Sequence, residues 1–255
     1  MAMLTSPALL LCLLLGSASA AAPPSLTGMY VASGDALELH RGPEGGLRGY
    51  LRSSGRIVAL NPVDVNEGVL RATATAEDGS RVELVATVTE GPVLTLGDRA
   101  YRRAAVERPA DATVRREIEE AYARLGRAVD ARDYAAFQAV RIPEFATIPP
   151  DGVPKSGAGM AERARGLLQR IQPPIRNTND VLELTVRGED AIAVVRQKFT
   201  RRQPVDAAGT LHEIHTEITQ RETWTRTSGG WKLSFVDDEI DPVREDRGPA
   251  AVSPR

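Results

Sequence analysis

Hydrophobic and polar positions follow two different periods along the chain, and the change falls after Pro109. Between Ser25 and about Arg103, short runs of alternating apolar and polar side chains are separated by seven turn segments rich in Gly, Asp and Ser. A period of two is typical of strands with one buried face. We therefore predict a small all-β domain over residues 25–103, a barrel or a sandwich of up to eight antiparallel strands.

The pattern after Pro109 predicts helices followed by strands. Apolar residues recur at helical spacing on one face of a long first helix: Val114, Ile118, Ala121, Tyr122, Leu125 and Val129. Asp133 is a typical N-cap for a short second helix, and Met160 to Ile171 marks a third. Four strands are predicted next: Val181–Arg187, Ala191–Thr200, Leu211–Thr227 and Trp231–Ile240. Helices that precede an antiparallel meander indicate an α+β domain.

These patterns divide the chain into segments. The all-β domain at 25–103 is followed by a linker at 104–112 and by the α+β domain at 113–241. Residues 244–255 are polar and Pro-rich, so we expect a disordered tail.

The N-terminus predicts an export signal over residues 1–20. An unbroken apolar run, Ala8–Leu15, precedes small residues that end in a cleavage site after Ala20. Leu11 before Cys12 does not fit a lipoprotein signal, and no stretch is long enough to span a membrane. We expect a cleaved signal peptide and a periplasmic or secreted protein without an integral membrane segment.

Charge and cysteine content exclude several classes of function. Lys and Arg total 32 against 34 Asp and Glu, so nothing favours nucleic acid as a partner. The single cysteine, Cys12, lies in the predicted signal, which leaves no disulfide and no thiolate ligand. There are three histidines in all, and His212 and His215 are three apart on a strand and project to opposite faces, so we expect no metal site. No phosphate loop or dinucleotide-binding Gly motif is present, and we expect no cofactor.

Four segments carry a family resemblance. They are Val129–Tyr134, Glu144–Gly152, Gly188–Val195 and Glu222–Leu233, the last with a tryptophan on each side of the final hairpin. In combination they resemble the nuclear transport factor 2-like superfamily, in its SnoaL-like and ketosteroid-isomerase-like bacterial branch, over residues 113–240. The resemblance implies a cone-like curved antiparallel sheet wrapped round the first helix and enclosing an apolar pocket. It implies fold more than activity.

The long predicted strand offers the candidate chemistry. Its alternation places His212, Gln220, Glu222 and Trp224 on the face expected to look into the cone, while the opposite face is polar and typical of solvent exposure. Burial there would raise the pKa of Glu222, a candidate catalytic acid. The alternative for this carboxylate is an ion pair with an arginine such as Arg196.

We expect four residues to contact a ligand: Tyr122 from the first helix, and His212, Gln220 and Trp224 from the long strand. By resemblance, Glu222 falls near the protonated acid of the steroid isomerases. The other isomerase residues are replaced, with Leu125 in place of the tyrosine and Pro149 or Pro150 in place of the aspartate.

Three functions remain open from the sequence. The first is non-catalytic binding of a small apolar ligand, or of a partner segment, in the cone. The second is an isomerase, cyclase or hydratase that uses Glu222 as acid or base, with Gln220 or His212 orienting the substrate. The third is a structural module that forms a homodimer through the sheet or binds an envelope partner through the β domain.

Overall fold

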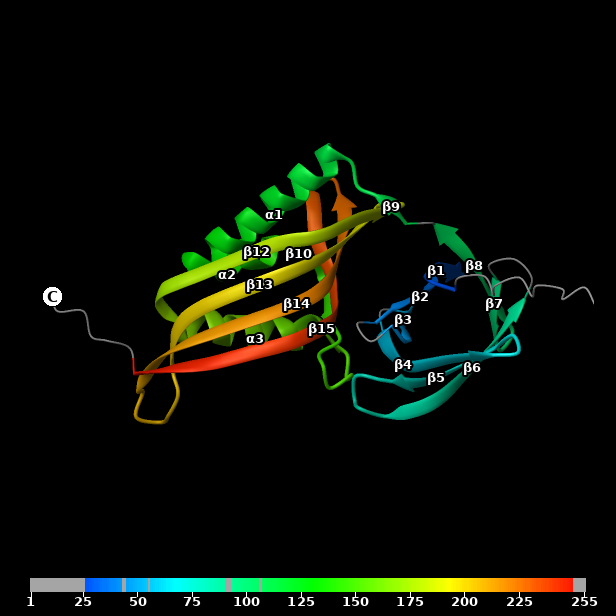
Figure 1. Ribbon diagram of the computed structural model, residues 1–255, viewed down its shortest axis with the longest axis horizontal. Coiled ribbons are helices and arrows are strands. Elements are labelled where there is room, and N and C mark those ends of the chain that lie inside the picture. The colour runs from blue at the N-terminus through cyan, green and yellow to red at the C-terminus, as the bar shows by residue number, and fades with distance from the viewer. Residues whose placement is uncertain (1–25, 43–44, 55, 90–92, 106, 250–255) are drawn as a thin grey trace, which may run out of the picture.

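The chain forms two domains, a β barrel followed by helices packed on a curved sheet (Figure 1). The structure, a computed structural model, describes residues 26–249 except 43–44, 55, 90–92 and 106. The predicted signal peptide at 1–20 lies outside the described residues. The all-β prediction for the first domain and the α+β prediction for the second are confirmed.

Eight antiparallel strands close the first domain into a barrel, because β1 pairs with both β2 and β8. The strands are β1 (Gly28–Ala32), β2 (Asp35–Arg41), β3 (Leu47–Ser53), β4 (Arg56–Asn66), β5 (Val69–Thr75), β6 (Arg81–Thr89), β7 (Val93–Leu96) and β8 (Arg99–Ala105). Closure pairs every strand on both sides, which removes the exposed edges of an open sheet.

Alternating residues of these strands fill the barrel interior. Tyr30, Leu37, Leu60 and Leu70 are fully buried in one apolar cluster. Gly49 allows β3 to approach β2 closely, since a Cβ at this position would lie 2.0 Å from the carbonyl oxygen of Glu38. The first domain therefore has its own core.

The second domain begins with helices, and the N-cap predicted at Asp133 is confirmed. The helices are α1 (Ala112–Asp130), α2 (Tyr134–Ala139) and α3 (Gly157–Arg170). The Asp111 side chain accepts hydrogen bonds from the amides of Thr113 and Val114, and Asp133 accepts one from Ala136. Among the described residues, no helix combines the length and the apolar content that a membrane span requires.

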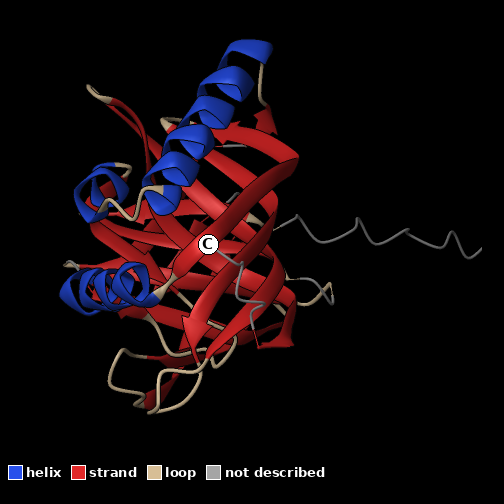
Figure 2. Cartoon of the chain, turned by 90° about the vertical axis from the view of Figure 1, so that its left-hand side faces the viewer, coloured by secondary structure: helices blue, strands red, loops and turns tan. Residues whose placement is uncertain are grey.

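Seven strands form the curved sheet, in the order β11-β10-β15-β14-β13-β12-β9. Their bounds are β9 (Arg108–Pro109), β10 (Arg141–Thr147), β11 (Lys155–Ser156), β12 (Gln172–Arg187), β13 (Asp190–Pro204), β14 (Leu211–Thr227) and β15 (Gly230–Pro249). All neighbours are antiparallel except β10 and β15. The helices gather on one side of this sheet (Figure 2).

The apolar face of α1 packs against the sheet as its spacing predicts. Ile118, Ala121, Tyr122, Leu125 and Val129 are buried in the core of the second domain. The opposite face of α1 is exposed and charged. This packing holds the helix across the concave side of the sheet.

Regular structure extends beyond the predicted elements. β12 begins at Gln172 rather than at Val181, and the predicted linker at 104–112 contains β9, which pairs with β12. Residues 244–249, expected in a disordered tail, belong to β15 and pair with β14 as far as Pro249. Residues 250–255 lie outside the described residues. β9, the first half of β12 and residues 244–249 lack an apolar alternation, and pairing with a neighbouring strand supplies their order.

The two domains share a small aromatic contact. The rings of Tyr50 from the barrel and Phe235 from the sheet lie 4.2 Å apart, and Ile57 and Ala146 complete this buried cluster. The barrel therefore covers one end of the outer face of the sheet.

A buried ionic network surrounds the aromatic contact. The Glu38 carboxylate of the barrel lies 2.6 Å from an Nη of Arg187 and 2.6 Å from an Nη of Arg221, and it accepts a hydrogen bond from the Tyr50 hydroxyl. Burial by itself raises the pKa of Glu38, but the charges of Arg221 and Arg187 outweigh burial and hold this pKa well below its ordinary value.

The polar face of β14 is predicted to be solvent-exposed, and this prediction is wrong for one end of the strand. Arg221 and Thr223, both on that face, are buried at 8% and 4% exposure. The barrel covers this end of the strand, and periodicity within the second domain alone does not reveal that cover.

Candidate functional site

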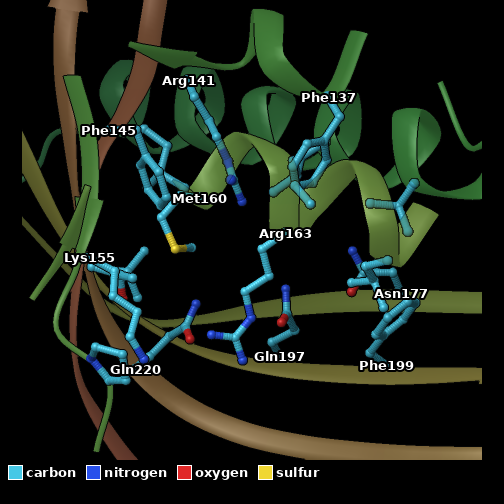
Figure 3. A pocket seen from close by; sticks show the side chains of 18 of the residues that line it. Phe137, Arg141, Phe145, Lys155, Met160, Arg163, Asn177, Gln197, Phe199 and Gln220 are labelled. Atoms are coloured by element: carbon cyan, nitrogen blue, oxygen red, sulfur yellow. The ribbon is translucent and has the colours of Figure 1, made fainter. Parts of the chain in front are cut away.

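The concave side of the sheet and the three helices enclose a cavity of about 780 Å³ (Figure 3). α1 supplies Leu125 and Val129, α2 supplies Phe137, and α3 supplies Met160 and Leu167. These apolar side chains form one wall of the cavity. The strands form the opposite wall, which is largely polar.

The polar wall follows from alternation along the strands. Inward positions on β12, β13 and β14 carry amide side chains, those of Asn177, Gln197 and Gln220. The Oδ1 atom of Asn177 is buried and has no hydrogen-bond partner. A buried acceptor without a partner costs free energy unless a ligand or water satisfies it.

Cationic groups outnumber carboxyl groups around the cavity. The cationic lining residues are Arg141, Lys155, Arg163, Arg170, Arg201 and Arg244, and the acidic ones are Asp151 and Glu222. One of these acids is already paired, because the Lys155 ammonium lies 3.3 Å from the Asp151 carboxylate. The cavity is therefore a positively charged site with an apolar wall, and not the purely apolar pocket that the resemblance implied.

Glu222 lies in the polar wall, within a chain of buried hydrogen bonds. The Tyr122 hydroxyl donates to one carboxyl oxygen at 2.7 Å, and the Gln220 amide donates to the other at 2.5 Å. The Trp224 indole donates in turn to the Tyr122 hydroxyl at 3.2 Å. These hydrogen bonds fix the orientation of the Glu222 carboxyl group.

Burial is the main influence on the protonation of Glu222. It raises the pKa of this carboxyl, and the hydrogen bonds from Tyr122 and Gln220 and the charge of Arg141 offset the rise only in part. Burial likewise raises the pKa of Tyr122 well above its ordinary value, with the charge of Glu222 adding to the effect. Tyr122 therefore acts as a neutral hydrogen-bond donor.

Arg141 is held at the cavity by two aromatic rings. Its guanidinium carbon lies 4.1 Å from the ring centre of Phe137 and 4.2 Å from that of Phe145. Burial lowers the pKa of Arg141 to about 10, although Glu222 and Tyr134 act in the opposite direction. The group therefore remains a cation at neutral pH.

The structure brings together four of the five predicted site residues. Gln220 and Glu222 line the cavity, while Tyr122 and Trp224 are buried behind Glu222 and do not line it. A ligand contact of Tyr122 or Trp224 therefore stays a prediction that this cavity does not support. Their observed contacts place them in support of Glu222.

His212 does not belong to the site. It lies ten residues before Glu222 on β14, about 33 Å away at the rise of a strand. Its ring instead contacts the Asp246 carboxylate at 2.8 Å. Alternation assigns a strand position to a face, but it does not say how far along the strand the cavity extends.

The predicted ion pair between Arg196 and Glu222 is also absent from the described residues. Arg196 lies on the outer face of β13, with its Nε atom 3.7 Å from Glu217. Sequence reasoning missed Arg141, Arg163 and Asn177, the residues that give the cavity its charge and its unpaired acceptor. Within the described part of the chain, no group of His, Cys, Asp and Glu side chains is arranged to hold a metal ion.

The Glu222→Gln variant tests the protonation of this buried carboxyl. The folded-state pKa of Glu222 lies above its ordinary value of 4.5. The resulting stabilisation is complete below the unfolded pKa and is lost as the pH rises through the folded pKa. We therefore expect the wild-type free energy of unfolding to fall with rising pH relative to that of Glu222→Gln. The expected fall is about 1.4 kcal/mol for each pH unit by which folding raises the pKa of Glu222.

Urea unfolding of both proteins between about pH 4 and pH 8 measures this difference. Glu217→Gln, on the opposite face of β14, controls for the loss of a carboxyl group from this strand. Parallel pH curves for the wild type and Glu222→Gln would show that the folded state does not favour the protonated acid.

Comparisons with known proteins agree on the second domain. A family model described as the SnoaL-like domain matches residues 110–237, which is half of the chain. The match contains the three helices and every residue that holds Glu222. A comparison with curated proteins finds no match.

Solved structures resemble the same half of the chain. A hexachlorocyclohexane dehydrochlorinase (LinA) type 2 is 14% identical, covering 56% of this chain and 94% of its own, with a TM-score of 0.45. An NTF2-like superfamily protein from Salmonella enterica serovar Typhimurium is 22% identical, covering 56% and 96%, with a TM-score of 0.41. A conserved protein from Planctomyces limnophilus is 14% identical, covering 52% and 100%, with a TM-score of 0.42. Likeness at this level carries no argument about activity.

Proposed function

Because the chain belongs to the SnoaL-like domain family through residues 110–237, we propose that its cone binds a small organic molecule and does not transform it. The observation that carries the proposal is the cavity of about 780 Å³, which the side chains of the cone leave open. Volumes of about 300–1,000 Å³ are typical of small-molecule sites. A purely structural module gains stability by filling such a space with its own side chains.

Two features favour binding over catalysis. Both oxygens of the Glu222 carboxyl already accept a hydrogen bond from the protein, and the residue is only 2% exposed. Leu125 lines the cavity where the resemblance places the tyrosine of the steroid isomerases, and Pro149 or Pro150, which both line it, takes the place of their aspartate. Neither replacement can donate or accept a proton.

A second function, acid catalysis by Glu222, is favoured by one observation. The carboxyl lines the cavity, and burial raises its pKa, which favours the protonated form that a general acid needs. In this alternative, Gln220 orients the carboxyl. An isomerase, cyclase or hydratase reaction on a bound ligand that disappears in Glu222→Gln would support it.

Export remains part of the proposal and rests on the sequence of residues 1–20 alone. Homodimer formation through the sheet is a further alternative. The barrel already covers the end of the outer face that holds Arg221 and Thr223, so a second copy would have to use the remainder.

Titration with N-phenyl-1-naphthylamine, a neutral fluorescent probe with two aromatic ring systems, tests the proposed binding. We expect saturable binding to the full chain, weakened at least about tenfold by Met160→Trp because the larger ring occupies the cavity. Met160 points into the cavity in Figure 3.

Gln169→Trp is the matched control, since Gln169 is exposed on the same helix and does not line this cavity. Equal affinities for the wild type and both variants would place the probe elsewhere and overturn the proposal. Absence of saturable binding to the wild type would overturn it as well.

A further inference from the structure

We propose that the ligand of the cone is an organic anion, with an apolar body against the helices and an oxyanion group bound by Arg141 and Arg163. This inference rests on the proposed function and names the chemical class that the cavity selects. Its basis is the arrangement of unpaired donors in the cavity, independent of the Glu222 hydrogen bonds.

Arg141 has donors to offer and no protein partner for them. Its guanidinium forms no hydrogen bond or salt bridge with any residue that the structure describes, and its Nε atom is buried without a partner. The rings of Phe137 and Phe145 cover the guanidinium. Cation–π contacts use the aromatic faces, so the N–H donors remain available to an oxyanion.

Arg163 adds a second cation from α3. Its side chain is exposed, lines the cavity and forms no hydrogen bond or salt bridge within the described residues. Figure 3 shows Arg141 and Arg163 both pointing into the cavity, whose other walls carry the amides of Asn177, Gln197 and Gln220. Two guanidinium groups suit an oxyanion because their donors bind carboxylate, sulfonate or phosphate oxygens in pairs.

The charge balance of the cavity favours an anion over a neutral ligand. Lys155 neutralises Asp151, and Arg201 is occupied by Gln203, Thr216 and the carbonyl of Phe199. The remaining acid is Glu222, whose pKa is raised by burial, so its repulsion of a bound anion is reduced. Arg141 and Arg163 form no salt bridge with a described residue, and the charges of Glu222 and Asp151 act on them only at longer range.

Apolar side chains beside Arg141 and Arg163 set the apolar part of the ligand. Leu125, Val129 and Leu167 come from the helices, and Phe137 and Phe145 extend the apolar surface to Arg141 itself. An oxyanion bound at Arg141 therefore has apolar surface directly beside it. A ligand with one charged end and one ring or chain matches this arrangement.

A matched pair of probes tests the inference: 8-anilinonaphthalene-1-sulfonate and N-phenyl-1-naphthylamine share their ring systems, and only the first carries a sulfonate. We expect Arg141→Met to lower the affinity of the full chain for the sulfonate about ten- to a hundredfold. This is the change in affinity that corresponds to the loss of one hydrogen bond between charged groups. The affinity for the neutral probe should change less than about threefold. Arg163→Gln should act in the same direction.

Arg124→Gln is the control, since Arg124 is exposed on α1 and does not line the cavity. An unchanged ratio of the two affinities in both Arg141→Met and Arg163→Gln would overturn the inference while leaving the proposed binding intact. If neither probe bound to the wild type, the proposed function itself would be overturned. A loss of both probes in Arg141→Met alone would reflect a collapsed cavity, and the ratio in Arg163→Gln would then decide.

Discussion

Arg187→Met is expected to lower the free energy of unfolding by about 3–5 kcal/mol. Arg187 is 2% exposed and lies 2.6 Å from the Glu38 carboxylate across the contact between the domains. Removing this guanidinium leaves Glu38 buried, with Arg221 as its remaining cation. A buried charge that loses a partner keeps its desolvation cost, and this accounts for the large effect.

Urea unfolding of the full chain measures the loss. Arg196→Met is the matched control, because Arg196 forms an exposed pair with Glu217 and such pairs contribute about 0–1 kcal/mol. The double variant Glu38→Gln with Arg187→Met should lose less than the sum of the two single variants. Equal losses for Arg187→Met and Arg196→Met would contradict the account of a buried network between the domains.

Trp224→Ala is expected to lower the free energy of unfolding by about 3–5 kcal/mol. Trp224 is fully buried, and its ring packs edge-on against Tyr122 with centroids 4.9 Å apart. Truncation leaves a void behind Glu222 and removes the donor to the Tyr122 hydroxyl. Trp224→Phe keeps most of the packing and should lose less.

Phe199→Ala is the control for removing an aromatic ring from the same domain. Phe199 is only partly buried and lines the open cavity, so its truncation creates no closed void. Circular dichroism during urea unfolding compares the variants. If Trp224→Ala cost no more than Phe199→Ala, the buried support of Glu222 would not be a main part of the core.

Periodicity predicted the elements whose buried face is apolar. The stripe on α1, the cap at Asp133 and the alternation that turns Gln220 and Glu222 inward are all observed. Each depends on local rules of spacing that hold wherever one face meets a core.

Features that depend on a second element were not predictable in this way. The first half of β12 is polar, and its order comes from pairing with β13. Arg221 sits on a face that looks solvent-exposed until the barrel is placed over it. Arg141 begins a strand that shows no marked pattern, and its role follows only from the rings of Phe137 and Phe145 that meet around it.

The central claim, a cone that binds a small organic molecule, is tested most directly by titrating the full chain with N-phenyl-1-naphthylamine beside its Met160→Trp variant. The account predicts saturable binding to one site per chain, at least about tenfold weaker in the variant, with Gln169→Trp unchanged. Binding that is absent from the wild type, or equal in all three proteins, would contradict it.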